Sequence, residues 1–178
     1  MSCPECGLDY ESLTAADAVV AIRGLPRRYR APLTRLLPGE DESVLRTRPA
    51  PDVWSPLEYA AHVREVLDGY ETRIRRALTE DRPELDPIEP DEAAERGRYD
   101  EQDPVGVADG IAAVAEVLAT TLESVPVEGW DRVGLSHGKE RSVLFTARRA
   151  VHEGSHHLLD IGRGLRAVRS GDRAAGGR

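Results

Sequence analysis

The chain has 178 residues, 40% of them hydrophobic, which suits one domain with a sizeable buried core. Aromatic residues make up only 4%, so aliphatic side chains must fill that core, which favours packed helices over a β-sandwich. The formal net charge of -8 excludes a general nucleic-acid-binding protein, because neutralising phosphates requires a basic face.

The sequence offers no targeting or membrane signal. No apolar run approaches the length of a transmembrane helix, and the start "MSCPECGLDY" lacks the basic and apolar regions of a secretion signal. We therefore expect a cytoplasmic protein without a membrane partner. Lys139 is the only lysine and all other basic residues are arginine, a bias typical of GC-rich genomes. Together with the abundant Ala, Gly, Val and Asp, it suggests an actinobacterium.

The first predicted helix opens at a capping box formed by Thr14 and Asp17. Apolar residues then recur at helical spacing as far as residue 36, but Pro26 and Pro32 interrupt them. We expect this helix to be kinked or split near Gly24. Residues 38–55 form a connector with one short helical turn around residues 42–46.

The second helix has the clearest start, the stretch "WSPLE". Ser55 is the N-cap, Pro56 occupies the first helical position and Glu58 completes a capping box, with the helix running to about Leu78. The acidic, proline-bearing residues 79–103 follow. We interpret them as a structureless crossover along the outside of a bundle, which makes the next helix parallel to the second.

The third helix begins at Asp103-Pro104 and ends before Pro126. A small hairpin is expected around His137-Gly138, and Ser142 then caps a fourth helix that runs to about Val168. These elements predict an all-α fold, a four-helix bundle with a long crossover between the second and third helices. We assign residues 14–168 to the bundle, 1–13 to an N-terminal extension and 169–178 to a disordered tail.

The fourth helix contains the pattern H-E-x-x-H, formed by His152, Glu153 and His156. Side chains four residues apart lie on one helix face, so both imidazoles can reach one metal ion, although they could also be a pair of half-buried polar residues. This pattern marks zinc metalloproteases, but no Glu follows Glu153, and Leu159 and Gly162 replace the Gly and His of a second protease class. Only 22 residues follow His156, so we reject a protease.

A third ligand could come from the second helix, where His62 lies near the buried stripe. A lone histidine there is more often a satisfied core residue than a ligand. If the second and fourth helices face each other, however, His62 meets the histidine pair. Three imidazoles would leave coordination positions open for water or substrate.

Two stretches together resemble the DinB/YfiT-like metal-binding bundle superfamily. They are "WSPLEYAAH", from Trp54 to His62, and the late "HEGSH", from His152 to His156. The resemblance extends from about residue 14 to residue 168 and includes the long second connection. It implies a divalent metal held by one histidine of the second helix and two ligands one turn apart on the fourth. Carried over, these are His62, His152 and His156.

The family includes thiol-dependent S-transferases and a mycothiol-dependent maleylpyruvate isomerase. The isomerase branch has a glutamate where we place His152, which brings this chain closer to the three-histidine members. The resemblance implies a metal-dependent enzyme that transfers a small thiol, such as mycothiol, to an electrophile. Zn²⁺ is the expected metal, with Ni²⁺ or Fe²⁺ as alternatives. A metal-dependent hydrolase and a non-catalytic, stress-related metal-binding module stay open.

Several polar residues near the motif have more than one interpretation. Glu153 is spaced to pair with His157 or Arg149, although it could act as a general base. Asp160 could orient an imidazole or simply pair with Arg163. Arg149 and Arg64 could bind an anionic group of a small-molecule substrate, or could be ordinary surface arginines.

Cys3 and Cys6 in "CPECG" make half of a zinc knuckle. They could be a loose reduced dithiol, a second metal site or a redox pair. A metal site needs two further ligands, from His137 or from a second copy in a homodimer.

Overall fold

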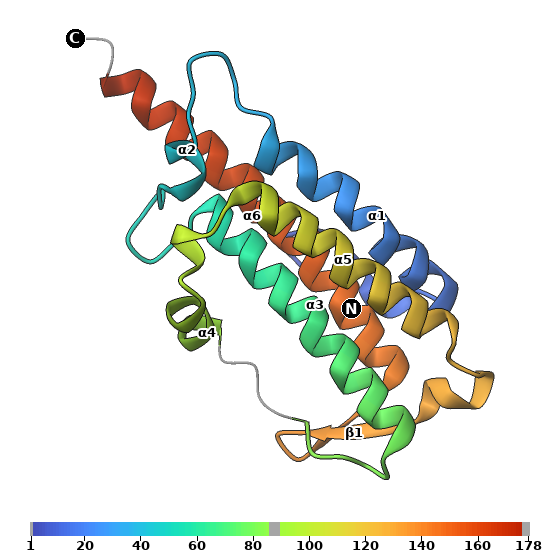
Figure 1. Ribbon diagram of the computed structural model, residues 1–178. Coiled ribbons are helices and arrows are strands. Elements are labelled where there is room, and N and C mark those ends of the chain that lie inside the picture. The colour runs from blue at the N-terminus through green and yellow to red at the C-terminus, as the bar shows by residue number, and fades with distance from the viewer. Residues whose placement is uncertain (1, 86–89, 176–178) are drawn as a thin grey trace.

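The computed structural model describes residues 2–85 and 90–175. Four long helices form the bundle: α1 (Ala15–Thr34), α3 (Pro56–Thr79), α5 (Pro104–Glu123) and α6 (Val143–Ala175). Helices α1 and α3 each pack against both α5 and α6 (Figure 1). The shorter elements are α2 (Ser43–Arg46), α4 (Pro90–Gly97), the 3-10 turns η1 (Tyr10–Ser12), η2 (Tyr99–Glu101) and η3 (Val127–Asp131), and the strands β1 (Val133–Ser136) and β2 (Lys139–Ser142). The predicted four-helix bundle is confirmed.

Helices α3 and α5 run in the same direction, because the chain between them returns along the outside of the bundle (Figure 1). The crossover predicted between the second and third helices is therefore present. It is not structureless, since it contains α4 and η2. Ala94 and Tyr99 are buried against the bundle, and this apolar contact fixes the two short elements. Residues 86–89 of the predicted crossover lie outside the described part.

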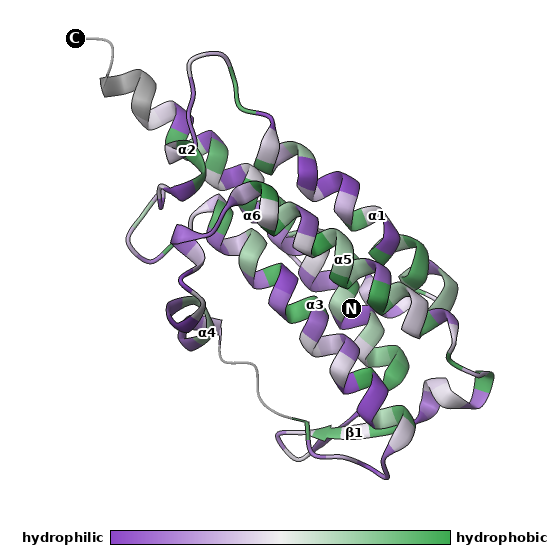
Figure 2. Cartoon of the chain, in the orientation of Figure 1, coloured by the Kyte–Doolittle hydropathy of each residue, from purple (hydrophilic) through white to green (hydrophobic). Residues whose placement is uncertain are grey.

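Aliphatic side chains fill the space between the four helices. Helix α5 is the most apolar element, mostly green in Figure 2, whereas α4 is largely purple. By length and composition alone α5 could cross a membrane. In the bundle it packs against α1 and α3, where Ile111, Leu118 and Leu122 are fully buried. Helix α5 is therefore apolar because its side chains form part of the bundle core.

Two helix boundaries differ from the sequence prediction. Helix α1 is continuous through Pro26 and Pro32 and ends at Thr34, so of the two predicted alternatives, a kinked or a split helix, the split is wrong. Its residues Leu25 and Tyr29 are fully buried, and that packing outweighs the hydrogen bonds that the prolines cannot make. Helix α6 continues past Val168 to Ala175. There Arg169 donates to Glu40 across 2.7 Å, which supports the added turn. Residues 176–178 lie outside the described part.

The hairpin predicted at His137-Gly138 is confirmed. Strands β1 and β2 pair antiparallel, and the two turn residues have φ of 50° and 69°, as a type I′ turn requires. The Oγ of Ser142 accepts a hydrogen bond from the Phe145 backbone at 3.0 Å and so caps α6 as predicted. The hairpin thus sets the start of the helix that carries the H-E-x-x-H pattern.

The predicted capping box of α3 is present and is buried. Glu58, only 4% exposed, accepts a hydrogen bond from the Ser55 backbone at 2.8 Å, and the Ser55 Oγ accepts one from the Glu58 backbone at 3.2 Å. Arg48 donates to the same carboxylate at 2.9 Å. Burial raises the pKa of Glu58, but the bonds from Arg48 and Ser55 outweigh it and lower the pKa below its ordinary value.

We expect Glu58→Gln to destabilise the fold by about 1–3 kcal/mol at neutral pH, because a buried donor loses its charged acceptor. The folded-state pKa is depressed, so this contribution is present above the unfolded-state pKa and is lost as the pH falls through the folded-state pKa. The stabilities that urea titrations give for the two proteins should therefore begin to converge as the pH falls below the unfolded-state pKa of about 4.3. Glu80→Gln, which breaks an exposed pair with Arg76, is the control and should change little. Equal losses in the two variants would contradict the assignment.

Candidate metal centre

Helix α6 carries two interleaved pairs of side chains of the types that can bind a metal ion. His152 and His156 form one pair, and Glu153 and His157 form the other, shifted by one residue. Each pair is spaced i, i+4 and so lies along one face, whereas neighbouring positions are rotated by about 100° around the helix axis. The two pairs therefore meet different parts of the protein.

The second pair meets α3. His62, Glu153 and His157, called here the His–Glu–His group, each offer one ligand atom, and these atoms lie within 4.8 Å of one another. The Nε2 of His157 is 3.3 Å from Glu153 Oε2, and the ring of His62 stands edge-on to that of His157 at 5.1 Å. His62 is only 5% exposed. The group thus lies between α3 and α6, with His62 buried and Glu153 and His157 half-buried.

The charges of this group are set by its neighbours. Burial opposes the charge of His157, but hydrogen bonds to Asp160 and Glu153 outweigh it and raise its pKa to about 9. Burial likewise raises the pKa of Glu153, but the bond from His157 and the charge of Arg149 outweigh it and lower the pKa to about 2. Glu153 is therefore an anion at neutral pH, and a pKa so far below neutral makes it a weak proton acceptor, which disfavours it as a general base.

His62 has the opposite environment. Burial, followed by the charge of His157, lowers its pKa to about 4, so it is a neutral imidazole at neutral pH. Trp54 packs against its ring with centroids 5.2 Å apart. Histidine binds metals as the neutral imidazole, so His62 is already in the form that a metal ligand needs.

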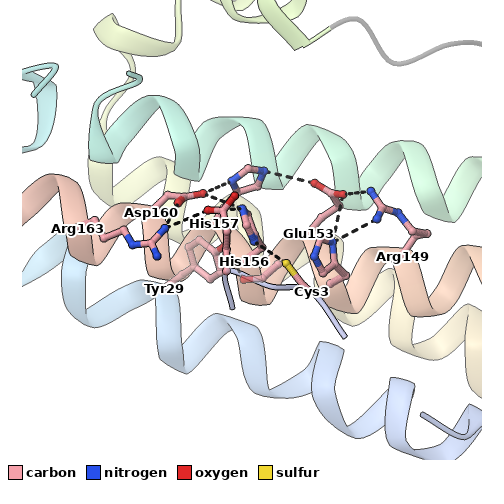
Figure 3. A network of polar contacts seen from close by, with 11 residues as sticks. Cys3, Tyr29, Arg149, Glu153, His156, His157, Asp160 and Arg163 are labelled. Atoms are coloured by element: carbon pink, nitrogen blue, oxygen red, sulfur yellow. Dashed lines mark hydrogen bonds and ion pairs between the residues drawn. The ribbon is translucent and has the colours of Figure 1, made fainter. Parts of the chain in front are cut away.

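Two side chains hold His157 and Glu153 in place. The Nδ1 of His157 lies 2.9 Å from Asp160 Oδ2, which directs Nε2 toward Glu153. Arg149 donates to Glu153 from the other side. Figure 3 shows Asp160, His157, Glu153 and Arg149 linked in this order along α6. A carboxylate behind a histidine fixes its tautomer in many metal sites.

The first pair meets the N-terminal segment. Cys3, Cys6, His152 and His156, called here the Cys–His group, also offer four ligand atoms within 4.8 Å of one another. The Sγ of Cys3 lies 3.6 Å from His156 Nδ1, the contact drawn between them in Figure 3. The two cysteines are thiols and form no disulfide. Backbone hydrogen bonds from Cys6 and Glu5 lower the pKa of Cys3 to about 7.

The structure thus divides the three histidines predicted to share one metal. His62 lies with Glu153 and His157, whereas His152 and His156 lie with the cysteines. Sequence reasoning did not select His157 as a ligand, although Glu153 and His157 have the same i, i+4 spacing as the chosen pair. Nothing in the sequence alone decided which pair faces α3.

The structure also shows which contacts the polar residues near the motif make. Glu153 makes both pairings that its spacing allows, with Arg149 and with His157. Asp160 lies closest to His157, but it also lies 3.5 Å from His156 Nε2 and 3.6 Å from Arg163. His137 is in the hairpin and is not part of the Cys–His group.

A cavity of about 240 Å³ adjoins the His–Glu–His group. Its lining comprises His62, Val66, Tyr70, Arg73, Pro90, Ser136, His137, Arg149 and Glu153. A neighbouring cavity of about 320 Å³ shares Tyr70, Arg73, Ser136 and Arg149 and adds Arg141. Arg73 and Arg149 therefore line the cavity beside the group, and Arg141 lines only the neighbouring one. Arg64 lines neither cavity and lies along Gly110 of α5.

A family model described as the DinB superfamily matches residues 22–161. The chain belongs to the DinB superfamily. The match contains the whole His–Glu–His group but not Cys3 and Cys6. The resemblance seen in the sequence is thereby confirmed. No curated protein matches this chain.

Solved structures share the fold of this DinB superfamily chain. YfiT from Bacillus subtilis, described as a probable metal-dependent hydrolase with an unusual four-helix bundle topology, is 16% identical, with a TM-score of 0.78 over 90% of this chain and 91% of YfiT. The mycothiol-dependent maleylpyruvate isomerase is also 16% identical, with a TM-score of 0.67 over 87% of this chain. This chain spans 63% of the isomerase. A histidine-to-alanine variant of that isomerase gives 13% identity and a TM-score of 0.68.

Proposed function

We propose that this chain is a metal-dependent enzyme whose metal is held by His62, Glu153 and His157, in place of the three-histidine set expected from the sequence. The observation that carries the proposal is that these three side chains converge beside a cavity that Arg149 also lines. The proposed substrates are a small thiol and an electrophile that carries an anionic group. We also propose that it works in the cytoplasm.

The three residues suit a divalent metal ion once His157 releases the proton that its raised pKa retains at neutral pH. Two imidazoles and one carboxylate are a donor set that Zn²⁺, Ni²⁺ and Fe²⁺ accept, and three protein ligands leave room for a further ligand. Their ligand atoms already lie within 4.8 Å of one another. A divalent ion held there would lower the pKa of a thiol or water molecule bound beside it.

The surrounding residues position the ligands and the substrate. Asp160 holds His157 Nδ1 and so keeps Nε2 directed toward Glu153. Arg149 donates to Glu153 and lines both cavities. Its other N–H donors could bind an anionic group of the substrate there. Arg141, stacked 4.5 Å from the Phe145 ring, adds positive charge to the far end. Proximity of thiol and electrophile in this space would speed their reaction.

Two nucleophiles are compatible with such a site, and each has a specific observation in its favour. A thiol is favoured by the ligand types. If the ligand pair on α6 is Glu153 and His157 and not His152 and His156, its first member is a glutamate, as the resemblance implies for the isomerase branch. Likeness in fold to the mycothiol-dependent isomerase points the same way. Water is favoured by the likeness to YfiT, described as a probable metal-dependent hydrolase, which covers nearly the whole chain. We therefore keep hydrolysis as the second candidate.

The test is a turnover screen of the zinc-loaded protein with carboxylate-bearing electrophiles and esters, with and without a small thiol. We expect electrophile loss that requires both the metal and the thiol, that a chelator abolishes, and that added zinc restores. Ester or amide cleavage without a thiol would instead support the hydrolase. Metal binding with neither activity across both substrate sets would contradict an enzyme of either kind.

A further inference from the structure

The N-terminal residues fold into a tight, hydrogen-bonded turn rather than a loose end. The Gly7 backbone donates to the Cys3 carbonyl at 2.9 Å, and the Cys3 backbone donates to Leu8 at 3.0 Å. Gly7 has φ of +72°, a left-handed conformation that glycine adopts without strain. This turn places the sulfurs of Cys3 and Cys6 together on the α6 side of the segment.

Two histidines of α6 complete the set. A tetrahedral zinc ion with usual Zn–S and Zn–N bond lengths separates a sulfur and a nitrogen ligand by about 3.6 Å. The Cys3 Sγ and His156 Nδ1 are 3.6 Å apart in the structure. All four ligand atoms lie within 4.8 Å of one another, so small side-chain movements would bring them onto one ion.

His152 provides an independent sign of a missing ligand partner. Its side chain is buried, at 9% exposed, and its Nε2 has no hydrogen-bond partner among the described residues. A buried polar atom without a partner destabilises the folded state. The Tyr10 ring lies 5.0 Å from that of His152 and covers it from the N-terminal side. A metal bond would use the nitrogen that the protein leaves unpaired.

Further contacts hold the segment on α6 independently of the sulfurs. Arg148 donates to the Leu13 carbonyl at 2.8 Å, and Arg163 pairs with Glu5 at 3.1 Å. Leu8 and Leu13 pack against the core. The turn is therefore positioned before any ion binds, which reduces the entropy lost on binding.

We infer that Cys3, Cys6, His152 and His156 form a second metal site that binds one Zn²⁺ and fastens the N-terminal segment to α6. Two thiolates and two neutral imidazoles are a typical donor set for structural zinc. On binding, each thiol releases its proton to solvent, and the two thiolates neutralise the charge of the ion. Four protein ligands leave no position for substrate, so this ion is structural. The inference does not depend on the proposed function.

The same geometry changes the earlier interpretation of the N-terminal cysteines. Their missing ligands come from the same chain, so neither His137 nor a second copy is needed. The site joins positions 3–6 to positions 152–156 and so closes almost the whole chain into a loop. Such a link stabilises the fold by restricting the unfolded chain and by the free energy of metal binding.

The experiment counts zinc in full-length protein purified under reducing conditions. We expect two ions per chain in the wild type and one in Cys3→Ser/Cys6→Ser, with metal-dependent turnover unchanged in that variant. His137→Ala removes a histidine outside both groups and should keep two ions. Cobalt substitution should give a thiolate-to-cobalt charge-transfer band in the wild type and in His62→Ala, but not in the cysteine variant.

The outcomes separate this inference from the proposed function. If neither the wild type nor any variant shows turnover, but the wild type still binds the cysteine-dependent ion, the proposed enzymatic function is wrong and the structural zinc site is still supported. The inference is overturned if the wild type and the cysteine variant bind equal amounts of zinc, or if His137→Ala loses an ion. It is also overturned if the cysteine-dependent ion amounts to half per chain in a dimer, or if no charge-transfer band forms.

Discussion

His62→Ala should lose the ion of the His–Glu–His group and at least about 100-fold of metal-dependent turnover. Loss of a residue that only supports a metal ligand typically costs 10- to 100-fold, so loss of a ligand itself should cost at least as much. Two remaining ligands, Glu153 and His157, would bind the ion far more weakly than three. Zinc analysis and turnover at saturating thiol measure the two losses. The zinc count should fall from two to one per chain, since the Cys–His group is untouched.

Matched variants on α6 decide between the two ligand sets. His157→Ala and His156→Ala remove neighbouring histidines from the same helix, yet they belong to different groups. We expect His157→Ala to lose turnover as His62→Ala does, while His156→Ala loses one ion and keeps turnover. If His156→Ala abolishes turnover and His157→Ala leaves it intact, the set of His62, His152 and His156 is correct and ours is not. Circular dichroism of each variant checks that it is folded.

Most of the fold could be predicted from the sequence because its signals are local. The capping boxes at Thr14 and Ser55, the cap at Ser142 and the turn at His137-Gly138 each depend on a few adjacent residues. The failures came where tertiary packing outweighs local propensity. Two prolines did not split α1, because its stripe is buried along the whole length. Likewise Tyr99 anchors a short turn within a connector whose composition predicts none.

The site was harder to predict, because a one-residue shift along a helix changes the face by about 100°. Both pairs on α6 have the spacing of metal ligands, so periodicity alone cannot say which of them faces His62. The N-terminal cysteines decide this, since their turn covers His152 and His156. The contact between the N-terminal cysteines and these histidines joins residues more than 140 positions apart, so no local sequence pattern could predict it. The familiar H-E-x-x-H pattern combines two residues of the Cys–His group, His152 and His156, with one residue of the His–Glu–His group, Glu153.

Tyr29 of α1 connects α1 to α6 through a buried hydrogen bond. Tyr29 is fully buried, and its hydroxyl donates to the Gly154 carbonyl at 2.8 Å. Burial raises the pKa of this hydroxyl, so it stays a donor at any ordinary pH. Gly154 permits the approach, because a Cβ there would lie 2.6 Å from Leu25 Cδ1. Gly154 follows His152 and Glu153 and precedes His156 and His157 on α6, so this contact helps to position both groups.

We expect Tyr29→Ala to destabilise the protein by about 3–5 kcal/mol, because it empties a ring-sized volume in a close-packed core. Tyr29→Phe keeps the ring and loses only the hydrogen bond, so it should cost about 0.5–1.5 kcal/mol. Val20→Ala, on the exposed side of the same helix, is the control and should stay within about 0.5 kcal/mol of the wild type. Urea unfolding at fixed zinc gives the three values. A loss in Tyr29→Phe as large as that in Tyr29→Ala would mean that the bond to Gly154, and not the packing of the ring, holds α1 against the helix that carries both groups.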